Sequence, residues 1–279
     1  MNDARRIWVN GRETPFLQAT DRGVLYGDGL FETILVRNGK APLLDRHLTR
    51  ILNDGGKLGL PIPSRNMLKQ ELESFLQSGE RDAAIKCVIT RGSSGRGYAP
   101  SGDTTASVLM FEYPMTELTE QQHSNGFITG VCTTRLGINP ALAGIKHLNR
   151  LEQVLAAEET RTAGLDEGIM LDINNMVIEG TRTNLFAVDN GKLITPTLDG
   201  SGVAGIMREM VIEFTNNKGK LVTICDITLD HLERCEEVFV SNSIHGVIPV
   251  RKIDDRDYSL GPVTHELQLE AAKWLGMVK

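Results

Sequence analysis

Short strand-like runs that end at tight-turn residues recur along this 279-residue sequence, and they restrict its fold more than any other feature. The turn candidates are Asn-Gly at 10–11 and at 38–39, Asn-Asn at 174–175 and Asp-Asn-Gly at 189–191. Asn and Gly tolerate the positive φ angles that two-residue hairpin turns require. We therefore predict antiparallel hairpins in both halves of the chain.

The hairpins alternate with segments of helical periodicity. Apolar residues recur at helical spacing over 44–58, 67–76 and 262–275, and Ser64 is placed to cap the second of these helices. Further helices are expected from near Val203 and at 229–234. The remaining apolar runs predict strands at 30–36, 83–90, 106–113, 127–134, 168–172, 176–179, 184–188, 192–194, 221–226 and 237–241.

One segment separates these elements into two groups. Residues 114–125 are polar and show no apolar periodicity, so we expect an interdomain linker there. The linker would join a small α+β domain over 1–113 to a larger domain over 126–279. The residue patterns thus indicate a two-domain protein of mixed α+β and α/β class.

Composition argues against several classes of function. The net charge is −6, whereas nucleic-acid binding needs a concentrated basic face. No apolar run reaches the ~20 residues of a membrane span, and residues 1–11 lack the apolar core of a signal peptide. The four cysteines form no CxxC pair, and the six histidines lack the spacing of metal ligands. We therefore expect a cytoplasmic protein that binds neither nucleic acid, nor membrane, nor metal.

Lys146 is the strongest candidate for a nucleophile. It precedes a predicted amphipathic helix whose apolar face would carry Leu148, Leu151, Val154 and Leu155. A lone lysine is more often an ordinary surface charge. At an apolar strand-to-helix junction, however, burial lowers the pKa of the amine, which is the property that a Schiff-base lysine needs.

Five segments of the chain resemble those of the fold-type IV pyridoxal-phosphate enzymes, and most of all the 4-amino-4-deoxychorismate lyase family. They are YGDGLFET at 26–33, RGSSGRGY at 91–98, GIKHLNRLEQ at 144–153, VIEGTRTNLF at 177–186 and GVAGIMRE at 202–209. The resemblance covers almost the whole chain. It implies a two-domain fold-type IV architecture like that of D-amino-acid aminotransferase, with the cofactor between the domains, and usually a homodimer.

The same resemblance assigns roles on the cofactor, pyridoxal 5′-phosphate. Lys146 would bind it covalently and act as the catalytic base, and Glu179 would face the ring nitrogen. From its residues alone, Glu179 could equally be a solvated carboxylate at the end of a strand. The phosphate would meet Arg50, the helix start at Ile206 and Met207, and Ser243.

The glycine-rich loop at 91–98 is predicted to bind substrate. A nucleotide-binding loop should open a helix, and this loop instead runs into Tyr98 and Pro100. Arg91 and Arg96 could each meet a carboxylate in bidentate fashion, and aminodeoxychorismate carries two. The alternative is a flexible surface loop with solvated arginines.

The activity that the resemblance implies is conversion of 4-amino-4-deoxychorismate to p-aminobenzoate and pyruvate, in folate biosynthesis. The alternative is an aminotransferase of the same fold that acts on branched-chain or D-amino acids. The run KHLNR at 146–150 favours the lyase, because Leu151 stands where those aminotransferases carry a tyrosine. Roles for Asn149, Glu32 and Thr33 stay open, as does a binding protein that has lost its chemistry.

Overall fold

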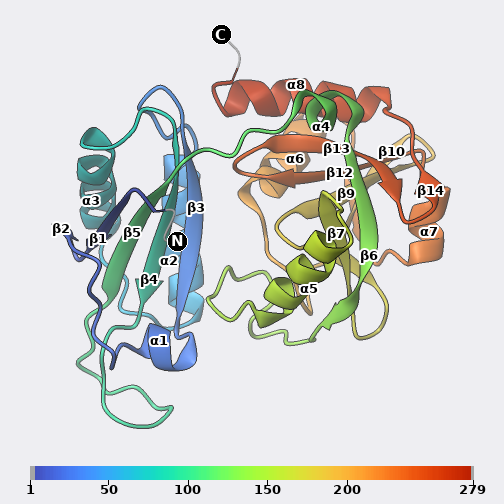
Figure 1. The fold of residues 1–279 in the computed structure, drawn as a ribbon. Coiled ribbons are helices and arrows are strands. Elements are labelled where there is room, and N and C mark those ends of the chain that lie inside the picture. Colours follow the sequence, from blue (N-terminus) through green and yellow to red (C-terminus); the bar gives the residue numbers. More distant parts are fainter. Residues whose placement is uncertain (1–3, 278–279) are drawn as a thin grey trace. The chain divides into compact units, whose positions relative to one another are not determined.

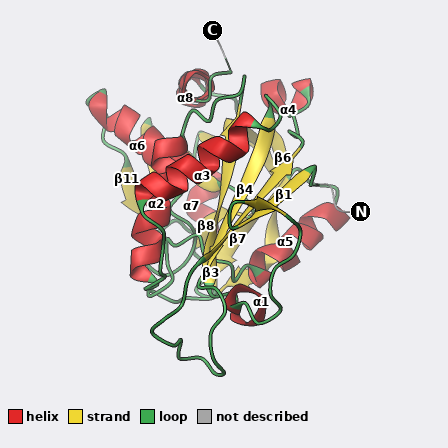
Figure 2. Cartoon of the chain, turned by 90° about the vertical axis from the view of Figure 1, so that its left-hand side faces the viewer, coloured by secondary structure: helices red, strands yellow, loops and turns green. Residues whose placement is uncertain are grey.

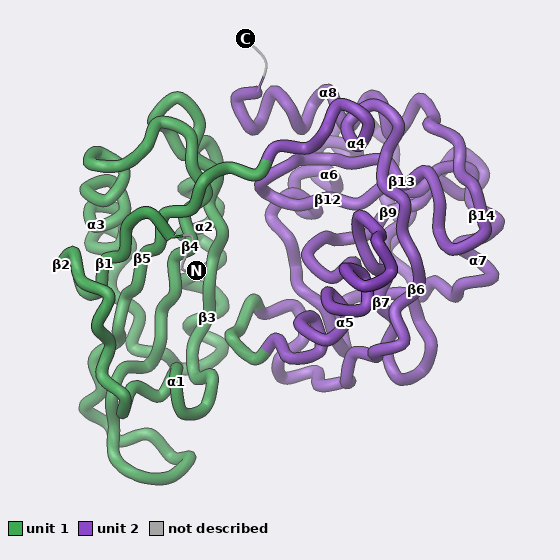
Figure 3. The backbone as a smooth tube through the Cα atoms, viewed as in Figure 1, with its two compact units in different colours: residues 1–116, 146–149 green, residues 117–145, 150–279 purple. Residues whose placement is uncertain are grey.

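The computed structural model describes residues 4–277 and divides the chain into two compact units (Figures 1 and 3). The first unit contains Met1–Thr116 together with Lys146–Asn149. The second contains Glu117–Ile145 and Arg150–Lys279. The change of unit after Thr116 falls inside the expected linker, 114–125, and part of that segment forms a short helix, Glu120–Asn125 (α4).

An antiparallel five-stranded sheet is the frame of the first unit, in the order β2-β1-β5-β4-β3. Its strands are Arg6–Val9 (β1), Arg12–Glu13 (β2), Gly29–Val36 (β3), Ala83–Thr90 (β4) and Ser107–Tyr113 (β5). The helices of this unit are Arg22–Tyr26 (α1), Leu44–Lys57 (α2) and Arg65–Gln77 (α3). The hairpin predicted at 10–11 is confirmed by the pairing of β1 with β2, and both long helices are confirmed. The turn at 38–39 is closed by a single bridge between Arg37 and Lys40, after which the chain enters α2.

Helices α2 and α3 lie against the sheet and build the core of the first unit (Figure 2). Leu48 and Ile51 of α2 are buried together with Leu72 and Phe75 of α3. The predicted Ser64 cap of α3 is confirmed, because the Ser64 hydroxyl accepts the N–H of Met67. The helix itself begins at Arg65, two residues before the predicted start.

Six strands of the second unit close into a ring. The sheet runs β11-β10-β9-β12-β13-β6-β7-β8. Strand β8 also pairs with β9, so the stretch of this order from β9 to β8 closes on itself. Its strands are Phe127–Leu136 (β6), Glu167–Asp172 (β7), Val177–Gly180 (β8), Asn184–Asp189 (β9), Lys192–Pro196 (β10), Thr223–Cys225 (β11), Glu237–Asn242 (β12), Gly246–Ile253 (β13) and Arg256–Asp257 (β14). The helices besides α4 are Leu151–Thr162 (α5), Ile206–Asn217 (α6), Leu229–Arg234 (α7) and Pro262–Trp274 (α8).

The connection between β6 and β7 positions the candidate lysine. These two strands are parallel, so the chain must make a long crossover between them. That crossover contains Lys146–Asn149, which group with the first unit, and then α5. The residue pattern places all of 126–279 in one domain, and the backbone pairing described below accounts for the grouping of Lys146–Asn149 with the first unit.

Two features of the second unit differ from expectation. The residue pattern predicted no strand over Gly246–Ile253, yet β13 pairs with both β12 and β6. Pro249, which lacks an N–H group, is unusual inside a sheet. The predicted apolar face of α5 is also wrong, because the helix begins at Leu151 and buries Ala156 and Thr160 instead.

None of the helices within residues 4–277 combines the length and the apolar character that crossing a bilayer requires.

Candidate active site

Lys146 lies on a segment that extends the sheet of the first unit. Strand β3 is the edge of that sheet, and Lys146–Asn149 run alongside it. The N–H of Phe31 donates to the Lys146 carbonyl at 3.0 Å, and the N–H of Leu148 donates to the Gly29 carbonyl at 3.0 Å. This backbone pairing explains why the lysine groups with the first unit.

Asp54 on α2 binds the backbone N–H of the same residue, Lys146. Its Oδ2 accepts the N–H of Lys146 at 3.2 Å, and the carboxylate is 5% exposed. Burial raises the pKa of Asp54, and Lys57 at 3.7 Å acts against that rise. The Lys146 side chain is half-buried, with Nζ 4.3 Å from the centre of the Phe31 ring. A strand and a helix of one unit therefore fix the backbone of the lysine.

Arg50, the predicted phosphate ligand, is held by a buried carboxylate. Its Nε and Nη2 donate to the two oxygens of Glu32 at 2.6 and 2.5 Å, and His47 Nδ1 lies 2.7 Å from Glu32 Oε2. Burial alone would raise the pKa of Glu32, but Arg50 and His47 lower it to about 2. Glu32 is therefore ionised at neutral pH and orients the Arg50 guanidinium.

The two loop arginines are in different settings. Arg91 donates to Asp28 at 2.7 and 3.1 Å and to the carbonyls of Leu58 and Gly59 at 3.0 and 2.6 Å. Its guanidinium is thus engaged within the first unit. Arg96 is exposed. The geometry favours Arg96 over Arg91 as a group that could meet a substrate carboxylate.

Glu179 lies at the end of a buried strand in the second unit and is 4% exposed. Its Oε2 accepts the N–H of Val203 at 2.8 Å, and its Oε1 accepts a long bond of 3.4 Å from Gln153. The turn at Val203 also pairs with Gly144, two residues before Lys146 in the chain.

The predicted phosphate cradle is the start of α6. Within the described residues no side chain caps this helix, whose N-cap is Gly205. Its first N–H groups, including those of Ile206 and Met207, have no partner inside the helix. Asn184 fixes the preceding turn by donating to the Val203 carbonyl at 2.7 Å. A Cβ on Gly205 would lie 1.9 Å from the Asn184 Oδ1, so any larger residue at this position would displace the Asn184 side chain.

The second unit also contains two buried serine hydroxyl groups. Across residues 4–277, the Oγ atoms of Ser201 and Ser241 are among the buried side-chain atoms without a hydrogen-bond partner. Ser201 precedes the Gly202 turn, and Ser241 lies at the end of β12. Ser243, which the sequence favoured, is half-buried just beyond that strand.

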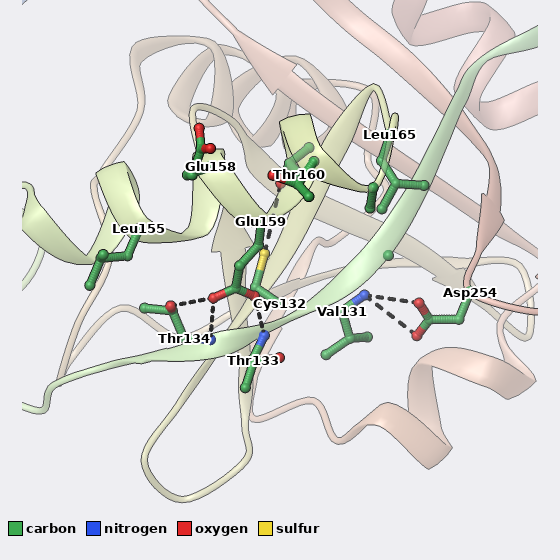
Figure 4. Close-up of a pocket in the computed structure, with 13 residues that line it drawn as sticks. Val131, Cys132, Thr133, Thr134, Leu155, Glu158, Glu159, Thr160, Leu165 and Asp254 are labelled. Carbon is green, nitrogen blue, oxygen red and sulfur yellow. Dashed lines mark hydrogen bonds between the residues drawn. The ribbon is translucent and has the colours of Figure 1, made fainter.

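A separate cavity of about 690 Å³ lies between β6 and α5 (Figure 4). The Glu159 carboxylate points to β6, where it accepts the N–H groups of Thr133 and Thr134 at 2.6 and 3.0 Å. Burial raises the pKa of the nearby Cys132 thiol to about 11, so this thiol is not a nucleophile at neutral pH. None of the predicted site residues lines this cavity.

Comparison with known proteins connects these elements to a family. The sequence profile of the family Amino-transferase class IV matches residues 29–253. The chain is 39% identical to the aminodeoxychorismate lyase of Vibrio harveyi, over 94% of this chain and 98% of that one. The chain belongs to the class IV aminotransferase family. Its fold-type IV architecture is the one that the sequence resemblance implied.

Solved structures of the family agree. The 4-amino-4-deoxychorismate lyase of Pseudomonas aeruginosa superposes with a TM-score of 0.91 at 40% identity, over 96% of this chain and 98% of that one. A branched-chain amino acid aminotransferase from a T.th. strain, solved with pyridoxamine 5′-phosphate, superposes with a TM-score of 0.85 at 26% identity, over 99% and 95%.

Fold-type IV enzymes depend on pyridoxal phosphate, and the residues of this chain fit such a cofactor. The uncapped start of α6 suits a phosphate, since backbone N–H groups and the helix dipole both favour an anion. The hydroxyl groups of Ser201 and Ser241 would otherwise remain buried and unsatisfied. A buried carboxylate such as Glu179 suits a protonated ring nitrogen.

Sequence reasoning missed Asp54 and Asn184 and left the role of Glu32 open. Asp54 follows the helical period of α2, and Asn184 follows a strand pattern, so neither carries a local signal. Glu32 lies inside an alternating strand. Its function becomes visible only when α2 brings Arg50 and His47 against β3.

The hydrogen bond between Asp54 and Lys146 can be tested by stability. Replacing Asp54 with Leu removes the acceptor, so we expect the free energy of unfolding to fall by ~1–3 kcal/mol. Asp54→Asn keeps a side-chain oxygen and should retain most of the stability. Urea unfolding of the three proteins measures both effects. An equal loss in both variants would mean that the carboxylate charge, not the hydrogen bond, matters.

The Glu32 cluster should give stability a defined pH dependence. Since the folded pKa is about 2 against an ordinary 4.5, Glu32 stabilises the fold above pH 4.5 and loses that effect as pH falls towards 2. The full effect is on the order of 3 kcal/mol. The difference in unfolding free energy between wild type and Glu32→Gln should therefore shrink across this range. Glu233→Gln, at an exposed position of α7, is the control.

Proposed function

We propose that this chain is a pyridoxal-phosphate-dependent lyase that converts 4-amino-4-deoxychorismate to p-aminobenzoate and pyruvate. The observation that carries this proposal is the similarity to two aminodeoxychorismate lyases at 39% and 40% identity, over nearly the whole of both partners. By contrast, the T.th. branched-chain aminotransferase is 26% identical. The run KHLNR at 146–150 points the same way.

Lys146 and Glu179 would hold the reactive part of the cofactor. When bound, pyridoxal phosphate supplies an electron sink conjugated to the amine of the substrate. Support for Lys146 comes from its backbone, which hydrogen bonds to Asp54 and Phe31 hold in place. Support for Glu179 comes from its burial and from the N–H of Val203, which donates to its Oε2 and fixes the carboxylate.

The phosphate would be bound by four residues. Ile206 and Met207 would donate backbone N–H groups from the start of α6, where an anion is favoured. Arg50 would add a positive charge, which Glu32 orients through two short hydrogen bonds. Ser243 would add a hydroxyl group next to the end of β12.

The proposed reaction removes a proton from the substrate and then breaks one carbon–oxygen bond. The Lys146 amine would remove the proton from C4 of the substrate. The bond between C3 and the enolpyruvyl oxygen then breaks, the fragment is released as pyruvate after taking up a proton, and the ring becomes aromatic. No amino group is transferred, so no 2-oxo acid is consumed.

Arg96 would bind one substrate carboxylate. Its support is its exposed position in the loop at 91–98 and the bidentate geometry that guanidinium groups offer to carboxylates. Arg91 is the weaker candidate, because Asp28 and two carbonyl groups engage its side chain.

The assay that tests the proposal mixes purified, cofactor-loaded protein with aminodeoxychorismate in the absence of any 2-oxo acid. We expect p-aminobenzoate and pyruvate in equal amounts. Lys146→Ala should lose the visible absorbance of the bound cofactor and at least ~10²-fold of the rate. Lys69→Ala, at a half-exposed position of α3, should change neither.

Two outcomes would contradict this proposal. Product formation that requires a 2-oxo acid, with amino transfer to it, would favour a branched-chain or D-amino-acid aminotransferase. Unchanged absorbance in Lys146→Ala would remove Lys146 from its assigned role.

We also infer that the protein is a homodimer. Helix α5 exposes three neighbouring apolar side chains, Leu151, Val154 and Leu155, at 77%, 60% and 58%. They occur at i, i+3 and i+4 and so share one face of the helix. Exposed apolar patches of this kind mark interaction surfaces, and each side chain gains ~1.5–3 kcal/mol on full burial.

Light scattering coupled to size-exclusion chromatography tests the dimer. We expect twice the chain mass for wild type and a shift to the monomer in Leu155→Glu, since a charge would have to be buried. Leu221→Glu, at an equally exposed apolar position elsewhere, should stay dimeric. A monomeric wild type would refute the inference.

The proposed products place the enzyme in p-aminobenzoate formation for folate biosynthesis, and a cytoplasmic location stays a prediction of the sequence.

A further inference from the structure

Arg22 is a buried charge for which the proposed chemistry provides no role. It is the first residue of α1 and is 3% exposed. Nε donates to Asp28 Oδ2 at 2.8 Å, and the guanidinium carbon lies 4.7 Å from the centre of the Tyr26 ring. A charged group this deeply buried needs such partners, because desolvation is costly.

The remaining donors of Arg22 reach the loop that contains Arg96. Nη1 donates to the carbonyl of Gly97 at 2.9 Å, and Nη2 donates to the carbonyl of Tyr98 at 2.6 Å. Nη1 also lies 3.4 Å from the Ser94 hydroxyl. One side chain thus binds the loop on both sides of Arg96.

The same carboxylate that holds Arg22 also holds the start of the loop. Asp28 Oδ2 accepts from Arg22 at 2.8 Å and from Arg91 at 2.7 Å. Burial would raise the pKa of Asp28, but the two arginines lower it, so the carboxylate is ionised at neutral pH. The backbone N–H of Arg22 adds a bond to the Gly92 carbonyl at 2.9 Å.

Glycines make this loop dependent on such bonds. Gly92, Gly95 and Gly97 lie close together within the loop at 91–98, and glycine loses more conformational freedom on ordering than any other residue. If nothing held the loop, the Arg96 side chain would become ordered only when substrate binds, and the entropy lost in that step would weaken binding. The bonds from Arg22 would remove this cost in advance.

We propose that Arg22 is the positioning residue for Arg96: it holds the carbonyl groups of Gly97 and Tyr98 so that the Arg96 guanidinium is presented to a carboxylate of the substrate. This inference rests on the proposed function, in which Arg96 binds aminodeoxychorismate. Arg22 itself does not contact the substrate. Its effect should therefore appear in KM and depend on the presence of Arg96.

Steady-state kinetics of holoenzyme variants test the inference. Arg22→Gln should raise KM for aminodeoxychorismate by about tenfold, the effect of ~1.4 kcal/mol, with kcat and the visible cofactor absorbance nearly unchanged. Arg22→Lys keeps one donor and should be intermediate. Arg6→Gln is the matched control, because Arg6 is also largely buried and ion-paired in the first unit but contacts Glu112 and Phe75.

A double-mutant cycle separates positioning from general destabilisation. In the Arg96→Gln background, Arg22→Gln should raise KM no further, since the group that it positions is gone. Trypsin cleavage after Arg96, measured on the folded holoenzyme without substrate, gives a readout that does not depend on activity. It should be about tenfold faster in Arg22→Gln, the factor expected for ~1.4 kcal/mol, and unchanged in Arg6→Gln.

The outcomes distinguish this inference from the proposed function. If Arg96→Gln raises KM but Arg22→Gln leaves it unchanged or acts additively, Arg22 does not position Arg96, and the lyase assignment still holds. If trypsin cleaves after Arg96 at wild-type rate in Arg22→Gln, the hold on the loop is refuted. If Arg96→Gln leaves KM unchanged, the substrate role of Arg96 fails and the inference fails with it.

Discussion

The candidate site depends on backbone hydrogen bonds between Lys146–Asn149 and the edge strand β3. An edge strand presents unpaired N–H and C=O groups, and here the crossover between β6 and β7 supplies partners for them. Asp54 accepts the N–H that points away from the strand. The position of residue 146 is thus set by hydrogen bonds of its backbone. The Lys146 side chain takes no part in these bonds, so its chemistry does not depend on them for a partner.

Carboxylates that are buried, or half-buried in the case of Asp28, fix the other candidate residues within each unit. Glu32 holds Arg50, Asp28 holds Arg91, and Glu179 holds the turn before α6 through the N–H of Val203. Each carboxylate would be costly to bury without charged or N–H donors. The donors in turn gain fixed orientations, which is the property that anion binding requires.

The spacing of apolar residues along the sequence was sufficient to predict most of the helices and strands. Helices α2 and α3 follow from apolar spacing and from the Ser64 cap, because one face of each packs on the sheet. Pattern failed at α5, whose buried side is made of Ala156 and Thr160. It failed again at β13, where ring closure places a proline-containing segment in a central strand.

The sequence by itself determined the family segments, the hairpins and the identity of Lys146, Glu179 and the arginines as candidates, since these are carried by residues close together in the chain. Tertiary structure decided which partner each candidate has. Arg91 is engaged by Asp28 and Arg50 by Glu32, across 63 and 18 positions of sequence. Side chains so far apart meet only because sheet register and helix packing bring them together, and no local pattern encodes that meeting.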